Sequence, residues 1–245
     1  MKNEKEKIIN WIKKYFEENG KSCKAIVGIS GGTDSSVVAA LCVEALGNEN
    51  VIGVLMPKGL QHDIVFSKKL VEFLKIEHYE VNIEKTVNDL KEAISLQMGV
   101  NPDEFDAYKT NQPARIRMAV LYGISAIIRG RVANTCNLSE DYVGYSTKFG
   151  DAAGDFSPIS DFTKTEVRKL GAELRLPEMF LKKVPEDGMS GKSDEEKLGF
   201  SYEILDKYIR TGNISDLKAK EKIDYLHKIN LHKILPMPKY KKGDE

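Results

Sequence analysis

Residues 30–36, with the sequence SGGTDSS, constrain the fold of this 245-residue chain more than any other segment. An apolar run at residues 25–27 precedes them and predicts a buried strand, and a helical pattern of apolar residues follows at 37–46. A strand that turns through two glycines into a helix leaves free backbone N–H groups at the positive end of the helix dipole. Gly31 and Gly32 let the backbone approach an anion closely because neither residue has a Cβ. The segment therefore predicts a phosphate-binding turn.

The side chains of this turn narrow the prediction. Ser30, Ser35 and Ser36 can add hydroxyl donors, whereas Asp34 would repel phosphate unless a magnesium ion lies between them. The alternative is an ordinary glycine turn in which an Asp or a Ser caps the following helix. The segment itself contains neither the Gly-Lys-Ser/Thr of kinases and GTPases nor a G-x-G-x-x-G pattern, so it is not a lysine-bearing P-loop.

Charge, apolar content and cysteine placement exclude several classes of protein. Lys plus Arg and Asp plus Glu both number 37, which disfavours a general nucleic-acid binder. No apolar stretch approaches the roughly 18–20 residues of a membrane span, and the charged amphipathic N-terminus does not resemble a signal peptide. Cys23, Cys42 and Cys136 form no C-x-x-C pair, so we expect reduced thiols in a cytoplasmic protein, without a disulfide or a zinc site.

Apolar periodicity predicts strands that alternate with helices. The predicted strands cover residues 24–28, 51–56, 79–83 and 132–135, and the predicted helices cover residues 8–19, 33–46, 65–74, 114–128 and 163–174. Residues 84–113 are expected to be less regular and to include loop, because they contain Gly99, Pro102 and Pro113. Thr163 and Glu166 form a plausible capping box.

This alternation predicts an α/β fold with a doubly wound parallel sheet and helices on both faces. Ligands of such sheets bind at the C-terminal ends of the strands, where the turn at 30–36, Met56-Pro57 and Thr135 all fall. We expect residues 1–245 to form a single domain. The composition of residues 184–197 suits either a mobile lid over the site or an ordinary surface loop.

Several later motifs, taken with the turn, resemble one family over residues 8–238. They are ARIRM at 114–118, NTCNLSE at 134–140, GYSTKFGD at 144–151, Asp155, the sequence TKT at 163–165, SDE at 193–195 and LGFSY at 198–202. Their order and spacing resemble ammonia-dependent NAD synthetase, and the turn resembles the pyrophosphatase loop of the wider ATP-pyrophosphatase superfamily. The resemblance implies a fold like that of the adenine nucleotide alpha hydrolases, described here as a single NAD synthetase domain.

The resemblance also implies a reaction. In this family the nicotinate carboxylate of deamido-NAD attacks the α-phosphorus of ATP, giving an acyl adenylate and pyrophosphate. Ammonia then displaces AMP and leaves the amide of NAD. Such chemistry needs neutralisation of charge and correct positioning more than it needs a protein nucleophile.

The family resemblance assigns residues to ATP and to magnesium. It implies Asp34 and Lys164 as catalytic residues, and Asp34 with Glu140 as ligands of Mg²⁺. Considered alone, Glu140 could be an acidic residue at a helix N-terminus, and Lys164 could be a solvated lysine. The ATP-binding residues implied are Gly28, Ile29, Ser30, Gly31, Gly32, Thr33, Asp34, Ser35, Met56 through its backbone, Gln61, Thr135 and Lys164.

A second set resembles the family's contacts to deamido-NAD, namely Arg115, Lys148, Asp155, His232 and Lys233. Arg115 could instead lie on the solvated face of its helix, and His227-Lys228 competes with His232-Lys233 for the family's His-Lys pair. His62 and His78 match no family position.

Two departures and two further expectations accompany the resemblance. Pro185 is followed by Glu186, where many members carry Ser or Thr, and Leu55 stands where many carry Arg; we assign Glu186 no role. The chain begins almost directly with the synthetase, so free ammonia is the expected nitrogen donor. A homodimer with substrate near its interface is also expected. The first predicted helix either contributes to that interface or packs in the core.

Two other functions remain open from the sequence. One is a tRNA-modifying enzyme of the same superfamily, which the positions of the cysteines and the zero net charge disfavour. The other is a nucleotide-binding sensor without catalysis, which would not need Asp34, Glu140 and Lys164 together.

Overall fold

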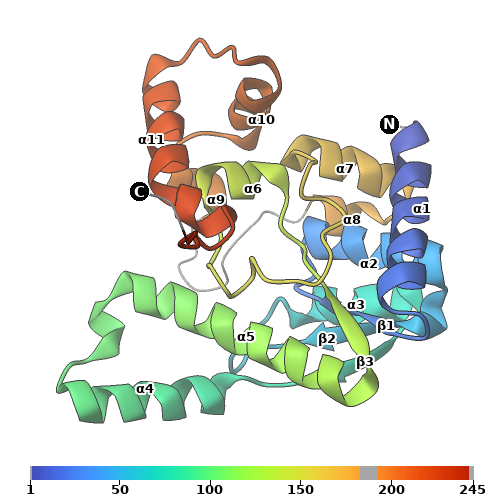
Figure 1. The fold of residues 1–245 in the computed structure, drawn as a ribbon, viewed down its shortest axis with the longest axis horizontal. Helices are drawn as coiled ribbons and strands as arrows, with labels where there is room; N and C mark the ends of the chain where they lie inside the picture. Colours follow the sequence, from blue (N-terminus) through green and yellow to red (C-terminus); the bar gives the residue numbers. More distant parts are fainter. Residues whose placement is uncertain (1, 183–192, 243–245) are drawn as a thin grey trace.

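The computed structural model describes residues 2–182 and 193–242, and its centre is a parallel sheet of four strands (Figure 1). The strands are β1 (Lys24–Gly28), β2 (Val51–Leu55), β3 (Glu77–Glu80) and β4 (Gly130–Ala133), and their order across the sheet is β3-β2-β1-β4. All neighbouring pairs are parallel, with Ile26 opposite both Ile52 and Val132. The predicted doubly wound α/β fold is confirmed, and its first crossover is the one that carries residues 30–36.

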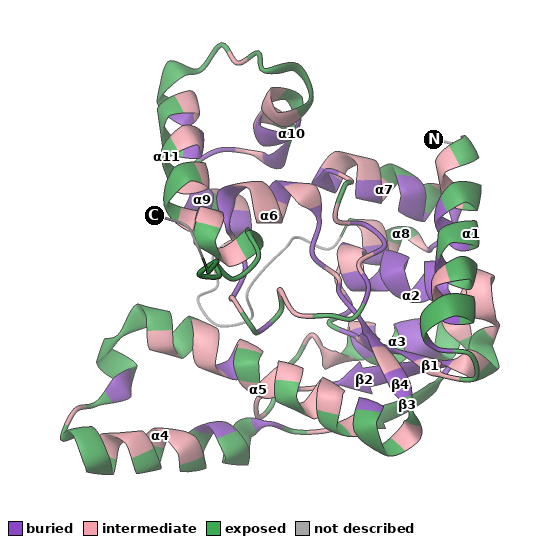
Figure 2. Ribbon diagram, viewed as in Figure 1, coloured by how far each residue is buried: buried purple, intermediate pink, exposed green. Residues whose placement is uncertain are grey.

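Each face of the sheet has its own apolar core, as period-two alternation requires. Ala25 and Val27 of β1 pack with α1 (Lys2–Asn19), α2 (Thr33–Leu46), α3 (Ile64–Leu74), α7 (Lys164–Glu173) and α8 (Glu178–Leu181). Ile26 packs on the opposite face with apolar side chains of α5 (Asp106–Ile128). Burial follows this layering, because β1, β2, β4 and α2 are mostly buried, whereas the outer helices mix buried and exposed residues (Figure 2).

A third apolar cluster lies beyond the sheet. It joins α6 (Leu138–Val143), α9 (Asp194–Leu198), α10 (Tyr202–Thr211) and α11 (Leu217–Ile234), and its buried members include Val143, Leu205 and Ile223. Figure 1 shows α10 and α11 above α6, away from the strands. The site described below lies between this helical cluster and the sheet.

Most predicted elements are confirmed within a few residues. The first helix packs its apolar face inside the molecule, since Ile8, Ile12 and Phe16 are buried there. The capping box of Thr163 and Glu166 at the start of α7 is present. Short 3-10 turns at Asn48–Asn50 and Pro102–Glu104 complete the described elements. In the described part of the chain, none of the helices combines the length and the apolar character needed to span a membrane.

The prediction for residues 84–113 was wrong for most of the stretch, although a connection without α-helix does lie between Met98 and Asp106. Most of this stretch is helical, because α4 covers Glu84–Met98 and α5 already begins at Asp106. Gly99 ends α4 with a φ of 67°, a genuine stop signal, but Pro113 lies inside α5 rather than before it. A proline removes one backbone donor and crowds the preceding turn, so it weakens a helix without always ending it.

Two further expectations need comment. The third strand was placed at residues 79–83, but it covers Glu77–Glu80 and is exposed at the sheet edge, where one side has no partner strand among the described residues. Residues 184–192 of the predicted lid at 184–197 lie outside the described residues. They include Pro185 and Glu186. Residues 193–197 begin α9, capped by Ser193.

Candidate active site

The turn between β1 and α2 has the geometry of an anion site. Gly31 has a φ of 72°, and a Cβ on it would lie 2.7 Å from the Cβ of Phe66 and 2.8 Å from the backbone nitrogen of Ser67. The N-cap of α2 is Gly32, which makes no side-chain cap bond to the first turn. Gly32, Thr33 and Asp34 line the cavity described below, so the positive end of the helix dipole lies at its wall.

The hydroxyl groups of the turn mostly hold the turn itself. The hydroxyls of Ser30 and Ser35 lie 3.0 Å apart, and the hydroxyl of Ser36 donates to the carbonyl of Gly32 at 2.7 Å. Thr33 donates to the carbonyl of Phe180 at 3.1 Å, which anchors the turn to α8. The Ser30 hydroxyl also accepts from the backbone N–H of Gly32 at 3.2 Å, so these bonds fix the backbone of the turn.

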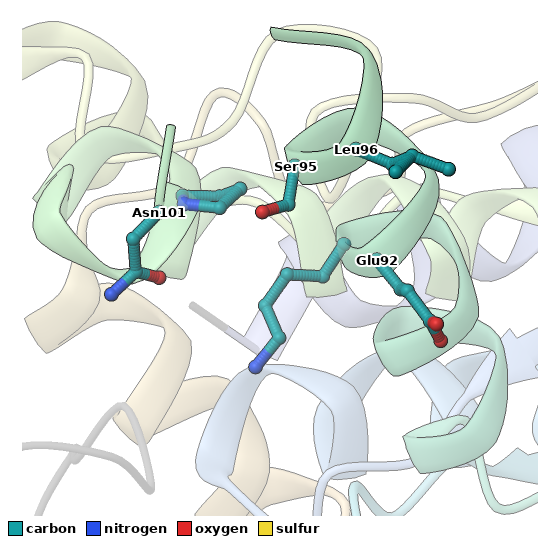
Figure 3. A pocket seen from close by; sticks show the side chains of 6 residues that line it. Glu92, Ser95, Leu96 and Asn101 are labelled. Atoms are coloured by element: carbon teal, nitrogen blue, oxygen red, sulfur yellow. The ribbon is translucent and has the colours of Figure 1, made fainter. Parts of the chain in front are cut away.

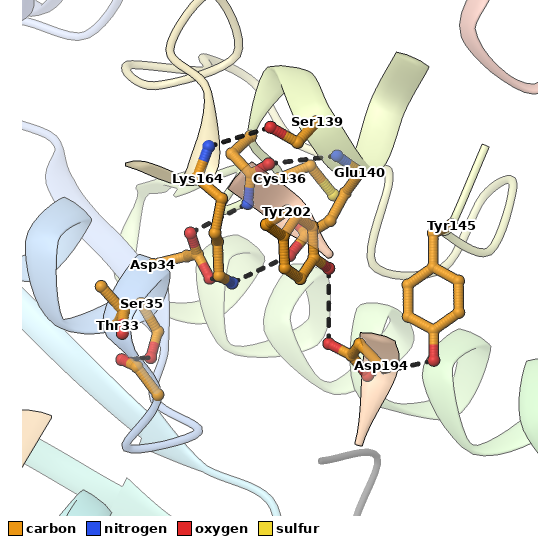
Figure 4. Close-up of polar contacts among 12 residues, drawn as sticks. Thr33, Asp34, Ser35, Cys136, Ser139, Glu140, Tyr145, Lys164, Asp194 and Tyr202 are labelled. Carbon is orange, nitrogen blue, oxygen red and sulfur yellow. Dashed lines mark hydrogen bonds and ion pairs between the residues drawn. The ribbon is translucent and has the colours of Figure 1, made fainter. Parts of the chain in front are cut away.

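Two carboxylates and one ammonium meet beside this turn (Figure 4). The Nζ atom of Lys164 lies 2.5 Å from Oδ2 of Asp34 and 3.1 Å from Oε1 of Glu140. Asp34 is in the first turn of α2, Glu140 in the first turn of α6, and Lys164 is the first residue of α7. Three helix N-termini thus converge on one point, and only 3% of the Lys164 side chain is exposed.

Asn137 organises two of these groups. Its side-chain amide donates to Oδ1 of Asp34 at 3.0 Å, and its side-chain oxygen accepts from the backbone N–H of Glu140 at 3.1 Å, which caps α6. The backbone N–H of Lys164 donates to the hydroxyl of Ser139 at 2.9 Å. Asn137, which ends the loop from β4, and Ser139 of α6 therefore connect the three segments that carry these charges.

Burial and charge act in opposite directions on the pKa values here. Burial raises the pKa of Glu140 well above its usual range, although the nearby Lys164 ammonium partly offsets this effect. Burial alone would lower the pKa of Lys164, but the attraction of Asp34 and Glu140 outweighs it, so the net shift is upward. Lys164 therefore remains an ammonium at neutral pH.

The donor set fits a magnesium ion that is shared with a phosphate. Magnesium is commonly held by one or two carboxylates together with oxygens of the substrate and water. Asp34 and Glu140 offer two hard oxygen ligands at one point. Within residues 2–182 and 193–242, no cluster of three or more His, Cys, Asp or Glu side chains offers a complete protein cage. The site thus suits a cation that arrives with an anionic ligand.

A cavity of about 1070 Å³ opens from this charged point. It lies at the C-terminal ends of the strands, as predicted, because Gly28, Met56 and Thr135 all line it. Of the predicted ATP-binding residues, those in its wall are Gly28, Ile29, Ser30, Gly32, Thr33, Asp34, Met56, Gln61, Thr135 and Lys164. Gly31 and Ser35 lie behind the wall, where they shape the turn. Glu140, the second predicted magnesium ligand, also lines the cavity.

The residues predicted for deamido-NAD are placed less uniformly. Lys233 lines the cavity and donates to the carbonyl of Gly144 at 2.7 Å. Arg115 donates to the carbonyl of Lys148 at 3.4 Å, and Lys148 donates to the carbonyl of His232 at 2.6 Å, so these three lie together outside the cavity wall.

Asp155 is engaged elsewhere. Its carboxylate accepts from the backbone N–H of Val132 at 2.7 Å and from the hydroxyl of Tyr122 at 3.3 Å, beside β4. The competing pair at 227–228 has a structural role, since the His227 ring stacks on Tyr142 with centroids 4.1 Å apart. The contacts of Arg115, Lys148, Asp155, His232 and Lys233 with substrate stay predictions.

Sequence reasoning missed several residues of the site. Arg117, not Arg115, lines the cavity, and its Nε donates to the carbonyl of Met56 at 3.1 Å. Positions i and i+2 of a helix face different directions, so the sequence could have shown that only one arginine of this pair points inward. Asp151 and Asp194 also line the cavity, and nothing in their spacing alone distinguished them.

A second, smaller cavity lies apart from the charged point. It measures about 280 Å³ and is formed between α4 and the turn that precedes α5 (Figure 3). Its lining residues are Lys91, Glu92, Ser95, Leu96, Asn101 and Pro102. It gathers no comparable set of charges from the described residues, so the larger cavity is the candidate active site.

Comparisons with known proteins agree with this geometry. A family model described as NAD synthase matches residues 4–242. An NH(3)-dependent NAD(+) synthetase of Methanocaldococcus jannaschii is 40% identical over 212 residues, or 84% of this chain and 80% of that protein. The structure of NMN synthetase from Francisella tularensis matches with a TM-score of 0.89 at 31% identity, covering 98% of both chains. The structure of NH3-dependent NAD synthetase from Campylobacter jejuni matches with a TM-score of 0.78 at 30% identity, covering 98% of this chain and 99% of that chain.

Proposed function

The chain belongs to the NAD synthase family and is a ligase, and we propose that it adenylates the nicotinate carboxylate of deamido-NAD with ATP and then uses free ammonia to form NAD. The observation that carries this proposal is the convergence of Asp34, Glu140 and Lys164 on a large cavity beside the glycine turn. This arrangement supports an enzyme rather than a sensor, because binding alone does not require two carboxylates at the phosphate position.

In the first half-reaction a carboxylate oxygen of the substrate forms a bond to the α-phosphorus of ATP. The bond from that phosphorus to the α–β bridging oxygen breaks, and pyrophosphate leaves. The amides of residues 33–35 and the ammonium of Lys164 would bind the phosphates and stabilise the negative charge on the leaving group. Asp34 and Glu140 would hold Mg²⁺, which supplies neutralisation of phosphate charge when bound.

In the second half-reaction the nitrogen of ammonia attacks the acyl carbon. A C–N bond forms, the bond from that carbon to the AMP oxygen breaks, and one proton is released. The cavity has room for both ligands, and Met56, Gln61 and Thr135 line the wall where the nucleoside would lie. Positioning of the two substrates would supply much of the rate.

Product analysis tests the proposal directly. The full chain, incubated with ATP, deamido-NAD, ammonium and magnesium, should give NAD, AMP and pyrophosphate in equal amounts by mass spectrometry. Release of ADP, or pyrophosphate release that requires tRNA instead of deamido-NAD, would contradict it. ATP binding without turnover would favour the sensor.

A second candidate substrate has its own support. The likeness to NMN synthetase from Francisella tularensis, at a TM-score of 0.89, favours nicotinate mononucleotide as an alternative acceptor with the same chemistry. The values of kcat/KM for deamido-NAD and for nicotinate mononucleotide decide between them. A higher value for deamido-NAD supports the first candidate, and a higher value for nicotinate mononucleotide supports the second.

We also propose that the protein works as a cytoplasmic homodimer, with deamido-NAD near the interface. Light scattering at micromolar concentration should give twice the 27.5 kDa of the chain. A mass of one chain that persists while the enzyme is active would contradict the dimer.

A further inference from the structure

The ammonium of Lys164 has a third neighbour besides its two carboxylates. An ammonium has three N–H donors, and Asp34 and Glu140 account for two directions. On another side the Nζ atom lies 5.3 Å from the centroid of the Tyr202 ring. This separation is within the ~6 Å at which a cation is attracted to an aromatic face.

Tyr202 is itself held rigidly. It is 2% exposed and belongs to the apolar cluster of α6 and α9–α11. Its backbone N–H donates to Oε1 of Glu195 at 2.9 Å, and its hydroxyl lies 3.5 Å from Oδ2 of Asp194. The other carboxylate oxygen of Asp194 accepts from the hydroxyl of Tyr145 at 3.0 Å, as Figure 4 shows. The ring therefore has a fixed position that does not depend on Lys164.

We propose that Tyr202 is a positioning residue whose ring holds the Lys164 ammonium at the phosphate end of the cavity. This inference rests on the proposed function, in which Lys164 binds the phosphates of ATP. When a nucleotide and its cation engage Asp34 and Glu140, those carboxylates no longer serve Lys164 alone. The ring attracts the ammonium without a net charge, so it retains the lysine without competing with phosphate as a third carboxylate would.

The ring and the hydroxyl of Tyr202 can be separated by substitution. Tyr202→Phe keeps the aromatic face and removes the hydroxyl, whereas Tyr202→Leu removes the face. We expect Tyr202→Leu to lower kcat/KM for ATP about fivefold to tenfold, and Tyr202→Phe to restore most of this loss. The KM for deamido-NAD should change little in either variant, because Tyr202 acts only through Lys164.

The same helix supplies a matched control. The Nζ atom of Lys220 lies 5.5 Å from the centroid of the Tyr208 ring, and the Tyr208 hydroxyl donates to Asp224 at 2.7 Å. Tyr208 packs against the same apolar cluster, but the cation over its ring is Lys220, whereas Lys164 lies over Tyr202. Tyr208→Leu therefore removes an aromatic ring from the same cluster without removing one from Lys164, and it should leave kcat/KM for ATP unchanged.

A fluorinated ring keeps the test decisive if Tyr202→Leu does not fold. Placing phenylalanine and then 3,4,5-trifluorophenylalanine at position 202 preserves the shape and removes the negative face of the ring. A fall in kcat/KM for ATP with fluorination, at an unchanged melting temperature, supports the proposal. Equal activity of the two rings would overturn it, as would Tyr202→Phe being as impaired as Tyr202→Leu. Because wild-type turnover is measured first, an inactive wild type would contradict the proposed function instead.

Discussion

At the scale of single residues, the site depends on the balance among three neighbouring charges, those of Asp34, Glu140 and Lys164. Asp34 and Glu140 are both close to Lys164, whose side chain is almost wholly buried, so each charge depends on the other two. Removing one member of a buried ion pair leaves an uncompensated charge, which is costlier than losing an exposed pair. Substitutions here must therefore be judged on stability and on activity separately.

Replacing Asp34 by Asn should abolish turnover with magnesium. The amide is nearly the same size but lacks the negative charge that a magnesium ion requires. Circular dichroism should show an intact fold, and product formation is followed by mass spectrometry. Near-normal activity would remove Asp34 from the metal site.

Replacing Lys164 by Ala should slow adenylation at least about tenfold, or ~1.4 kcal/mol in the barrier. The reason is that no ammonium would then stabilise the phosphates as pyrophosphate leaves. Single-turnover measurement of pyrophosphate release tests the adenylation step alone. An unchanged rate would show that this lysine does not reach the phosphates.

Asp141 provides a test of pH dependence. Burial, with a smaller contribution from Asp151, raises the pKa of Asp141 to about 6, whereas an unfolded chain has about 3.9. Between these values the folded state binds more protons than the unfolded state, so ionisation of Asp141 makes stability fall as the pH rises. Urea unfolding at a series of pH values should show Asp141→Asn gaining stability relative to the wild type from pH ~4 to ~6. A constant difference across this range would contradict the shift.

At the scale of secondary structure elements, the turn after β1 requires a glycine, whereas the helix α5 does not. Gly31 has a positive φ and is packed against Phe66 and Ser67, whereas a Cβ added to Gly123 in α5 would meet no atom within 4 Å. The first glycine is required by geometry, and the second is only a weak point of a helix.

These two glycines therefore predict opposite effects of alanine. Gly31→Ala should lower the free energy of unfolding by at least about 1 kcal/mol, because of both strain and collision. Gly123→Ala should raise it by about 0.5–1 kcal/mol, since the helix gains a better helix former. Chemical denaturation of both variants measures these changes. Equal signs would contradict the assignment of the two backbone conformations.

Sequence patterns predicted elements where local and tertiary preferences agreed. The buried strands at 24–28 and 51–55, the glycine stop after α2 and the capping box of α7 all have strong local signals. The helical start of α5 was missed because the local signal of Pro113 pointed the other way.

The residues of the site also differ in how far the sequence predicted them. Asp34 was singled out by its turn, while Glu140 and Lys164 were assigned through the family resemblance, and the structure brings all three together. The position of Tyr202 beside Lys164 could not be read from the chain. Those residues are 38 positions apart (202 − 164), and their contact depends on how a separate apolar cluster packs.

At the scale of the whole molecule, the candidate site lies across two apolar cores. Asp34 lies in the first turn of α2 and Lys164 begins α7, and both helices pack on the sheet. Glu140 belongs to α6, which packs with α9–α11. Asp194 of α9 and Lys233 of α11 also line the cavity, and both helices belong to that third apolar cluster. A ligand that contacts residues of both apolar cores should therefore stabilise the packing of one core against the other.

Hydrogen exchange should detect this stabilisation. Addition of magnesium and ATP should slow amide exchange in α6 and α9 as well as in residues 30–36, because a ligand that binds only the folded state stabilises whatever it bridges. Exchange measured by mass spectrometry with and without the nucleotide tests the prediction. Protection confined to residues 30–36 would contradict it.

The position of Lys164 between Asp34 and Glu140 also affects the order in which ligands are expected to bind. Asp34 and Glu140 already have the Lys164 ammonium between them, so they should bind a free divalent ion weakly. That ion would first have to displace the ammonium. An incoming polyphosphate removes this obstacle, because it offers the ammonium a new anionic partner. Under the proposed function, nucleotide and metal are therefore expected to bind together, and the unliganded form avoids the mutual repulsion of two bare carboxylates.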